Sequence, residues 1–184
     1  MSVFGKIKTL LGVKPKDPAL ISVVLHFRKP ISLPDEAIHA AIRRAWGRDV
    51  NKDLNEHVVG KLPICFLKLE GVMLLLSNVQ KPYCPPEMME QALAEFSEVR
   101  QRKVVRDHKG FLAIDLYDPK DPRKTEKLEC YRQMCRLAAE FVDYNCMGVY
   151  LPEIGHMRPY DVDLIPALRS EQPLKEIQSG DSRP

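Results

Sequence analysis

Hydrophobic side chains recur along the chain with two different periods, and the alternation of these periods predicts a mixed α+β protein. Runs that are apolar at every position or at every second position, and rich in β-branched residues, predict strands. Apolar residues spaced three and four apart predict helices that are buried on one side. The predicted strands span 20–27, 63–69, 72–79, 111–117 and 147–151, and the predicted helices span 33–46, 86–96, 124–142 and 162–170.

The first six elements follow the order β-α-β-β-α-β, which is the order of a ferredoxin-like, or split βαβ, core. In that arrangement two helices cover one face of an antiparallel sheet. The long helix at 124–142 and the strand at 147–151 add an αβ unit, which extends the sheet at one edge or covers its other face. The predicted fold class is therefore α+β: a ferredoxin-like βαββαβ core with an added αβ unit, in which helices pack on an antiparallel or mixed sheet.

Local signals set several boundaries. Gly47 ends the first predicted helix, because glycine readily adopts the left-handed conformation that follows many helices. Glu70-Gly71 joins two strands in a tight hairpin. The consecutive residues Leu74 to Leu76 predict a strand that is buried on both faces. The polar segment 48–61 is predicted to be a loop.

The size and charge of the chain fit one domain and identify no partner. The 184 residues can bury a sizeable core, and 28 basic against 25 acidic residues give a net charge of +3. No apolar run approaches the roughly 18 residues of a membrane span. We predict a single domain at 19–170, preceded by an amphipathic segment and linker at 1–18 and followed by a flexible polar tail at 171–184.

The cysteines lack the tight spacing of a disulfide framework or of a zinc site. Several fall in apolar strand-like or helix-like segments, so buried, reduced thiols are predicted. Reduced thiols indicate a reducing compartment, and the predicted location is cytoplasmic. The five cysteines are Cys65, Cys84, Cys130, Cys135 and Cys146.

The first 13 residues combine an apolar face with positive charge, and they lack the long apolar region of a signal peptide. Such a segment is compatible with peripheral contact with an anionic membrane surface. A terminal helix that packs on its own domain or on a second copy is the favoured interpretation. The residues concerned are Val3, Phe4, Ile7, Leu10 and Leu11, with Lys6, Lys8, Lys14 and Lys16.

The loop at 152–161 is the first place to look for a function. It crowds polar and titratable groups directly after an apolar strand, and loops held by a rigid scaffold often carry function. An ordinary connection that forms hydrogen bonds with itself is the competing interpretation. The candidate residues are Glu153, His156, Arg158, Tyr160 and Asp161.

A second candidate is a polar cluster of His108, Asp115 and Asp118 around a predicted strand. Imidazole and carboxylate groups suit zinc or manganese, but the chain has no established metal-binding motif. A nucleophilic pair of Cys84 with His108 requires the two to meet, which nothing in the sequence indicates. No phosphate-binding glycine cluster occurs. We therefore predict no metal and no cofactor.

A third candidate is a basic patch at 100–109, accompanied by a second basic cluster at 43–52. If both lie on one face of the protein, they form a stripe that contacts phosphates. Solvated helix faces are the competing interpretation, and it is favoured over nucleic-acid binding. The patch comprises Arg100, Arg102, Lys103, Arg106 and Lys109, and the second cluster comprises Arg43, Arg44, Arg48 and Lys52.

Three segments of the second half resemble a bacterial family known only as domain of unknown function 4261. They are HKGFLAIDLYD at 108–118, the helix YRQMCRLAAEFVD at 131–143 and MGVYLPEIG at 147–155. The family has no established activity. The resemblance therefore implies a fold grouping and a bacterial setting, and it assigns no catalytic residue.

Catalytic signatures are missing from the sequence while core patterning is good, so a non-enzymatic protein is favoured over an enzyme. The leading hypothesis is a cytoplasmic bacterial α+β module that binds another protein or associates with itself. The first alternative is a hydrolase or metal-dependent enzyme with a site near His108, Glu153 and His156. The second alternative is weak nucleic-acid binding through the basic helix faces.

Overall fold

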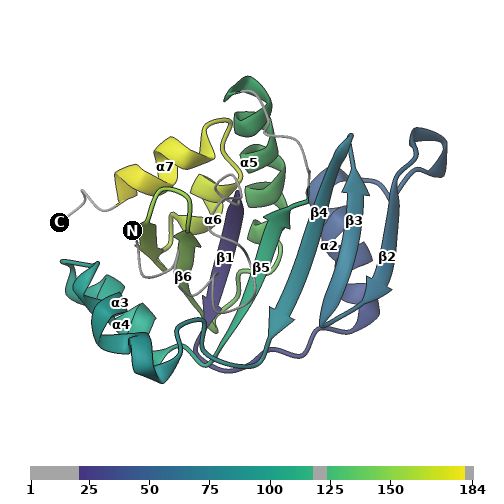
Figure 1. Ribbon diagram of the computed structural model, residues 1–184. Helices are drawn as coiled ribbons and strands as arrows, with labels where there is room; N and C mark the ends of the chain where they lie inside the picture. Colours follow the sequence, from purple (N-terminus) through teal and green to yellow (C-terminus); the bar gives the residue numbers. More distant parts are fainter. Residues whose placement is uncertain (1–20, 118–123, 181–184) are drawn as a thin grey trace.

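The computed structural model describes residues 21–117 and 124–180, and their strands form one antiparallel sheet (Figure 1). The strand order is β2-β3-β4-β5-β1-β6-β7. Every neighbouring pair is antiparallel. The strands are β1 (Ser22–Phe27), β2 (His57–Lys61), β3 (Ile64–Leu69), β4 (Val72–Val79), β5 (Gly110–Leu116), β6 (Cys146–Leu151) and β7 (His156–Pro159).

Helices lie on both faces of the sheet but cover them unequally. Figure 1 shows α2 and α5 behind the sheet, on what we call the back face, and α3 and α4 beside β6. Side chains of α3 and α4 pack on the opposite, front face. The helices are α2 (Asp35–Trp46), α3 (Met89–Ala94), α4 (Val99–Asp107), α5 (Lys124–Ala139), α6 (Leu164–Leu168) and α7 (Pro173–Ser179), with 3-10 turns at Lys52–Leu54 and Pro86–Met88.

The α+β class is confirmed, but the strand arrangement is not that of a ferredoxin-like core. In that core the first strand lies between the third and fourth strands of the motif. Here β5, the fourth strand of the predicted motif, forms hydrogen bonds with both β1 and β4 and so separates them. Element order does not fix strand order, because each antiparallel pairing is decided by contacts between distant segments.

The back face holds the larger core. Alternate residues of the central strands point to it, and the apolar stripes of α2 and α5 cover them. On β3 and β4 the fully buried residues are Leu67, Leu74 and Leu76, which share a cluster with Ile38 and Ile42 of α2. Side chains buried to this degree each contribute about 1.5–3 kcal/mol relative to exposure.

The front face holds a smaller core over β1, β6 and β7. Here Val104 and Val105 of α4 pack with Val24, Tyr150 and Met157 of the sheet. Only part of the front face lies under α3 and α4, because these two short helices lie beside β6, toward the β6–β7 edge of the sheet (Figure 1).

The predictions that depend on the conformation of one or two residues, a helix end and a hairpin turn, are confirmed. Gly47 adopts φ 68° after α2 and donates its N–H to the Arg43 carbonyl. Glu70 and Gly71 have φ 48° and 80° and join β3 to β4. Both signals come from residues tolerating positive φ at a turn.

Three predicted irregular segments contain regular structure. The loop at 48–61 ends in β2, and the loop at 152–161 contains β7. The tail predicted from 171 contains α7, in which Pro173 and Ile177 are buried. The polar composition of these segments hid the few apolar residues that attach them to the sheet. The predicted segment at 1–18 lies outside the described residues.

All five cysteines are buried and free, as predicted. Burial raises the pKa of the Cys146 thiol to about 12 and also raises that of Cys135. Raised pKa values keep these groups as thiols at neutral pH, which is the state of structural, unreactive cysteine.

Candidate functional site

The predicted functional loop at 152–161 holds α7 against the sheet. Arg158 lies in β7 with its side chain only 3% exposed. It donates hydrogen bonds to both carboxylate oxygens of Asp161, at 3.0 and 3.2 Å, and to the Glu176 carbonyl at 2.7 Å. Asp161 also accepts the N–H of Asp163 at 2.9 Å. The Arg158–Asp161 pair therefore stabilises the packing of β7 and α7.

Glu153 and His156 of the same loop contact different helices. Glu153 accepts a hydrogen bond from the Tyr131 hydroxyl at 2.8 Å and forms an ion pair with Lys127, and both partners lie on α5. The Nε2 atom of His156 lies 3.3 Å from the Ile177 carbonyl of α7. Burial, and then the bond to Glu153, raise the pKa of Tyr131. The structure thus distributes these residues among helix contacts and does not gather them into one site.

His108 lies on the front face, and both of its ring nitrogens have partners. Nε2 accepts the N–H of Tyr83 at 2.7 Å, and Nδ1 lies 2.9 Å from the Val104 carbonyl. Because a carbonyl only accepts, these contacts assign the proton to Nδ1 of a neutral ring. Burial lowers the pKa of His108, which favours the same state. In this state the ring has no lone pair left for a metal ion or a substrate proton.

A second buried histidine, His26, packs against the first. Its ring centroid lies 4.4 Å from that of His108 and 5.6 Å from that of Tyr83, with edge-to-face geometry in both cases. Its Nδ1 atom is buried and has no hydrogen-bond partner among the described residues. Burial, and then the neighbouring His108, lower the pKa of His26 well below its usual value. His26 was not among the predicted site residues, because a lone histidine in an apolar strand carries no motif.

Of the predicted cluster of His108, Asp115 and Asp118, the first two lie at opposite ends of β5 and do not meet. Asp115 lies near the far end of β5 and accepts a hydrogen bond from the Ser22 hydroxyl. Asp118 lies outside the described residues. Burial, and then nearby carboxylates, raise the pKa of Cys84, so this thiol is not activated for attack.

The predicted enzyme site near His108, Glu153 and His156 is also not assembled. The registers place His108 beyond the end of β1 at Phe27, whereas Glu153 follows β6 beyond its pairing with Val24. At about 3.3 Å per strand residue, the two ends are more than about 13 Å apart. The three side chains therefore do not face one another.

The basic patch on α4 is exposed, but it does not continue into the second basic cluster. Residues 43–48 lie on and after α2, on the back face, whereas α4 packs on the front face. The second cluster is also paired: Arg43 with Asp49, Arg44 with Glu140 and Arg48 with Glu56. On α4, Arg100 donates to the carbonyl of Tyr160, at 3.0 Å, and Arg106 pairs with Asp107. The arrangement provides no continuous stripe for phosphates.

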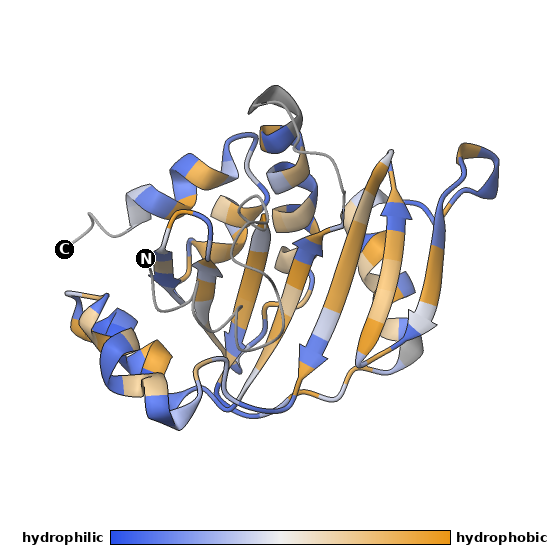
Figure 2. Cartoon of the chain, viewed as in Figure 1, coloured by the Kyte–Doolittle hydropathy of each residue, from blue (hydrophilic) through white to orange (hydrophobic). Residues whose placement is uncertain are grey.

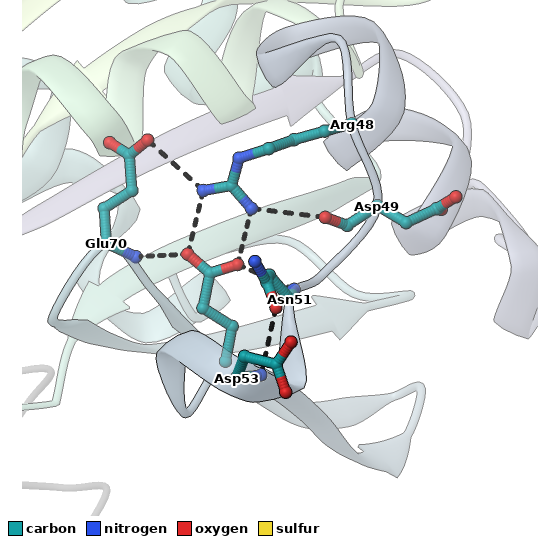
Figure 3. A network of polar contacts seen from close by, with 6 residues as sticks. Arg48, Asp49, Asn51, Asp53 and Glu70 are labelled. Atoms are coloured by element: carbon teal, nitrogen blue, oxygen red, sulfur yellow. Dashed lines mark hydrogen bonds and ion pairs between the residues drawn. The ribbon is translucent and has the colours of Figure 1, made fainter.

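A buried carboxylate, Glu56, organises the segment that leads into β2. Arg48 donates two hydrogen bonds to it, at 2.5 and 2.9 Å, and the N–H groups of Asn51 and Glu70 donate two more. Figure 3 shows how Arg48, Asn51 and Glu70 converge from separate parts of the chain. These bonds, led by those from Arg48, hold the pKa of Glu56 at about 2. The network fixes the 48–56 loop against the β3–β4 turn, and it is a structural clamp.

The largest unexplained feature is an apolar surface on the front face of β2 to β5. We call it the open patch. Its side chains belong to neither core cluster, and no helix among the described residues packs on them. Val59, Ile64 and Tyr117 are 54%, 56% and 52% exposed. The rings of Phe66 and Tyr117 meet edge to face, with their centroids 5.1 Å apart. The open patch comprises Val59, Ile64, Phe66, Met73, Leu75, Val79 and Tyr117.

The open patch corrects the prediction that the strand with three consecutive leucines is buried on both faces. Leu74 and Leu76 are buried under α2, whereas Leu75 points to the front face and is only half-buried. The apolar residues that suggested burial of both faces are present, because β3 and β4 carry such residues on each face. The pattern alone does not say whether the fold covers both.

Charged groups of both signs border the open patch. The front-face positions of β2 to β4 include His57, Lys61 and Lys68 and contain no aspartate or glutamate. Asp115 lies at the β5 border of the patch and accepts the hydrogen bond from Ser22. The patch is therefore an apolar surface bordered by Lys61 and Lys68 on one side and by Asp115 on the other.

The described residues contain no group of three or more His, Cys, Asp or Glu side chains placed to hold a metal ion. Within the same residues, no helix combines the length and the apolar character needed to cross a membrane.

Comparisons with known proteins add no relative. No family model matches the chain, and neither a curated protein nor a solved structure matches it. The resemblance in the second half of the chain therefore stays a prediction.

Proposed function

We propose that this protein is a non-catalytic module that binds another protein through the open patch. The observation that carries the proposal is that the two faces of β3 and β4 differ in how far they are covered. Their back face is sealed by α2, whereas the apolar side chains of their front face join no core. Contiguous exposed apolar surface of this kind marks interaction sites in soluble proteins.

The size of the patch favours a segment of another protein over a second copy of this chain. Seven side chains that are at most about half exposed present on the order of 400 Å² of surface, given about 150–250 Å² for a whole aromatic side chain. A standard stable interface buries about 800 Å² on each partner. A short partner segment needs no more than the patch offers.

The polar residues predicted as site candidates support the non-catalytic part of the proposal. Each of His108, Glu153 and Arg158 is occupied by hydrogen bonds within the fold. The five buried, free thiols support a reducing, cytoplasmic setting. The bacterial setting rests on the resemblance alone.

Affinity capture followed by reconstitution from purified components tests the proposal. The variant Ile64→Glu places a charge in the open patch, and Ile154→Glu is its matched control, because Ile154 is 43% exposed in the turn between β6 and β7. We expect a purified partner to bind the wild type and Ile154→Glu equally, and to bind Ile64→Glu at least tenfold more weakly. A partner that binds Ile64→Glu with unchanged affinity contradicts the proposal, and so does the failure to capture any protein that Ile64→Glu loses.

A further inference from the structure

We infer that a cleft between α2 and the end of α5 binds a small organic phosphate. The cleft has a volume of about 530 Å³, which lies within the range of small-molecule sites. It shares no residue with the open patch, so the inference goes beyond the proposed function. Three observations carry it: ordered walls, an excess of positive charge and an apolar part of the lining. The lining residues are 28–33, Ala37, Arg44 and 140–145.

Hydrogen bonds between separate segments hold the walls of the cleft in place. Asn145 exchanges two hydrogen bonds with the backbone of Lys29, both at 2.9 Å, and its own carbonyl accepts the N–H of Arg28. The side chain of Asn78, in β4, donates to the Ile31 carbonyl at 3.0 Å. A site whose walls are already ordered loses little conformational entropy when a ligand binds.

Arg44 presents a fixed guanidinium group in one wall. Its Nε donates to the Glu140 carboxylate at 2.9 Å, and its Nη2 donates to the Glu140 carbonyl at 3.1 Å. The carboxylate is only 2% exposed and also accepts a hydrogen bond from Arg169 at 2.6 Å. The Nη1 atom of Arg44 has no partner among the described residues, and the side chain is 54% exposed. The guanidinium is therefore held by two bonds while one nitrogen stays available to an anion.

The described lining carries more positive than negative charge. Arg28 and Lys29 contribute two cations whose side chains have no partner within residues 21–117 and 124–180. The lining acids are Asp143 and Glu140, and two arginines already share the charge of Glu140. Together, these groups leave an excess of two positive charges. A phosphate monoester carries about 1.5 to 2 negative charges at pH 7 and balances this excess, whereas a carboxylate balances about half of it.

Apolar side chains beside these charges suit the organic part of such a ligand. Ile31, Leu33 and Val142 line the cleft and are only partly buried, and the ring of Tyr144 is 92% exposed. Inorganic phosphate would leave this surface in water. The cleft therefore favours a phosphate that is attached to an apolar or aromatic group.

NMR titration of the full-length protein with phenyl phosphate tests the inference, because backbone amide shifts report both affinity and location. We expect saturable shifts centred on Ala37, Phe141 and Asn145. Phenyl phosphate should bind several-fold more tightly than inorganic phosphate or benzoate, which lack the ring or half of the charge. Phenol, which is neutral, should not saturate the protein at the same concentrations.

Arg44→Gln and Arg43→Gln form a matched pair of variants. Both arginines lie on α2, are about half exposed and pair with a carboxylate, but of the two only Arg44 lines the cleft. We expect Arg44→Gln to weaken the binding of phenyl phosphate about tenfold, and Arg43→Gln to leave it unchanged. Ala37→Leu fills the cleft without changing a charge and should also weaken binding, which keeps the test valid if Arg44→Gln disturbs the packing of α2.

An absence of saturable shifts, or shifts centred on the basic residues of α4, would overturn the inference. Equal losses from Arg43→Gln and Arg44→Gln would reduce the binding to nonspecific attraction. Equal affinity for benzoate would refute the assignment to phosphate, and tighter binding of a phosphotyrosine peptide would assign the cleft to a protein ligand. The open patch is tested separately, because Ile64→Glu should leave the binding of phenyl phosphate unchanged.

Discussion

The two faces of β3 and β4 carry the same kinds of side chain, yet only the back face is covered by a helix of the described residues. On the back face, Leu67, Leu74 and Leu76 are completely covered in the core under α2. On the front face, Phe66 and Leu75 are half-buried and belong to neither core. Figure 2 shows both strands as largely hydrophobic ribbons, with helices behind them only. The difference teaches that apolar character alone does not define a core; a core also needs an element that covers it.

The largest effect expected from this comparison belongs to Leu76→Ala. Leu76 is fully buried, so truncation leaves a cavity and should lower the free energy of unfolding by about 2–5 kcal/mol. Urea denaturation followed by circular dichroism measures the change. A loss below about 1 kcal/mol would contradict the view that α2 seals this face.

A slightly smaller effect is expected from Glu56→Gln, which tests what fixes β2 at the edge of the open patch. The amide keeps the size of the side chain but leaves Arg48 with only the more distant charge of Glu70, and it turns one acceptor into a donor. We expect a loss of about 2–4 kcal/mol in the free energy of unfolding.

Glu70→Gln is the control for that experiment. Glu70 is more exposed and meets Arg48 only at 3.4 Å, so its loss should cost less than about 1 kcal/mol. Equal losses for the two variants would show that the backbone hydrogen bonds to Glu56 contribute nothing beyond the surface charges.

Turns and individual strands were predictable from the sequence, whereas the way in which distant elements pack on one another was not. Gly47 and the Glu70-Gly71 turn follow from conformations that few residues accept. The alternation of apolar residues correctly predicted β3 to β5. The strand order, the open patch and the buried Glu56 depend on which distant segments meet, and no window of sequence contains that information. The loop at 152–161 was singled out as a candidate functional site because polar side chains that contact helices look, in sequence, like those that bind ligands.

The front core should make the stability of the protein depend on pH, because His26 and His108 are buried in that core. Their pKa values are lowered in the folded state, so the unfolded chain binds protons first as the pH falls below about 6.5. Stability should be complete above that pH and should decrease below it, by up to about 1.4 kcal/mol per pH unit for each histidine.

Unfolding measured at pH 7.5, 6.5 and 5.5 checks this dependence, with His26→Phe as the comparison. Phenylalanine keeps an aromatic ring against His108 and binds no proton, so the slope below pH 6.5 should fall by up to half. A slope that His26→Phe leaves unchanged would mean that His26 does not remain neutral in the folded protein. At lower pH, stability should fall further as Glu56 is protonated between about 4.5 and 2.

The smallest effect on stability, and the sharpest test of the comparison, is expected from Leu75→Ala. Leu75 neighbours Leu76 on the same strand but points to the open patch, so its truncation removes partly exposed surface and leaves no cavity. We expect the free energy of unfolding to fall by about 1 kcal/mol, since Leu75 is only partly buried and its truncation leaves no enclosed cavity. We also expect the affinity for the partner captured by the wild type to fall at least fivefold, whereas Leu76→Ala should leave that affinity close to its wild-type value under folded conditions. If Leu75→Ala destabilised the protein as strongly as Leu76→Ala, the front face would already be covered within the chain, and a surface that is already covered has no need of a partner.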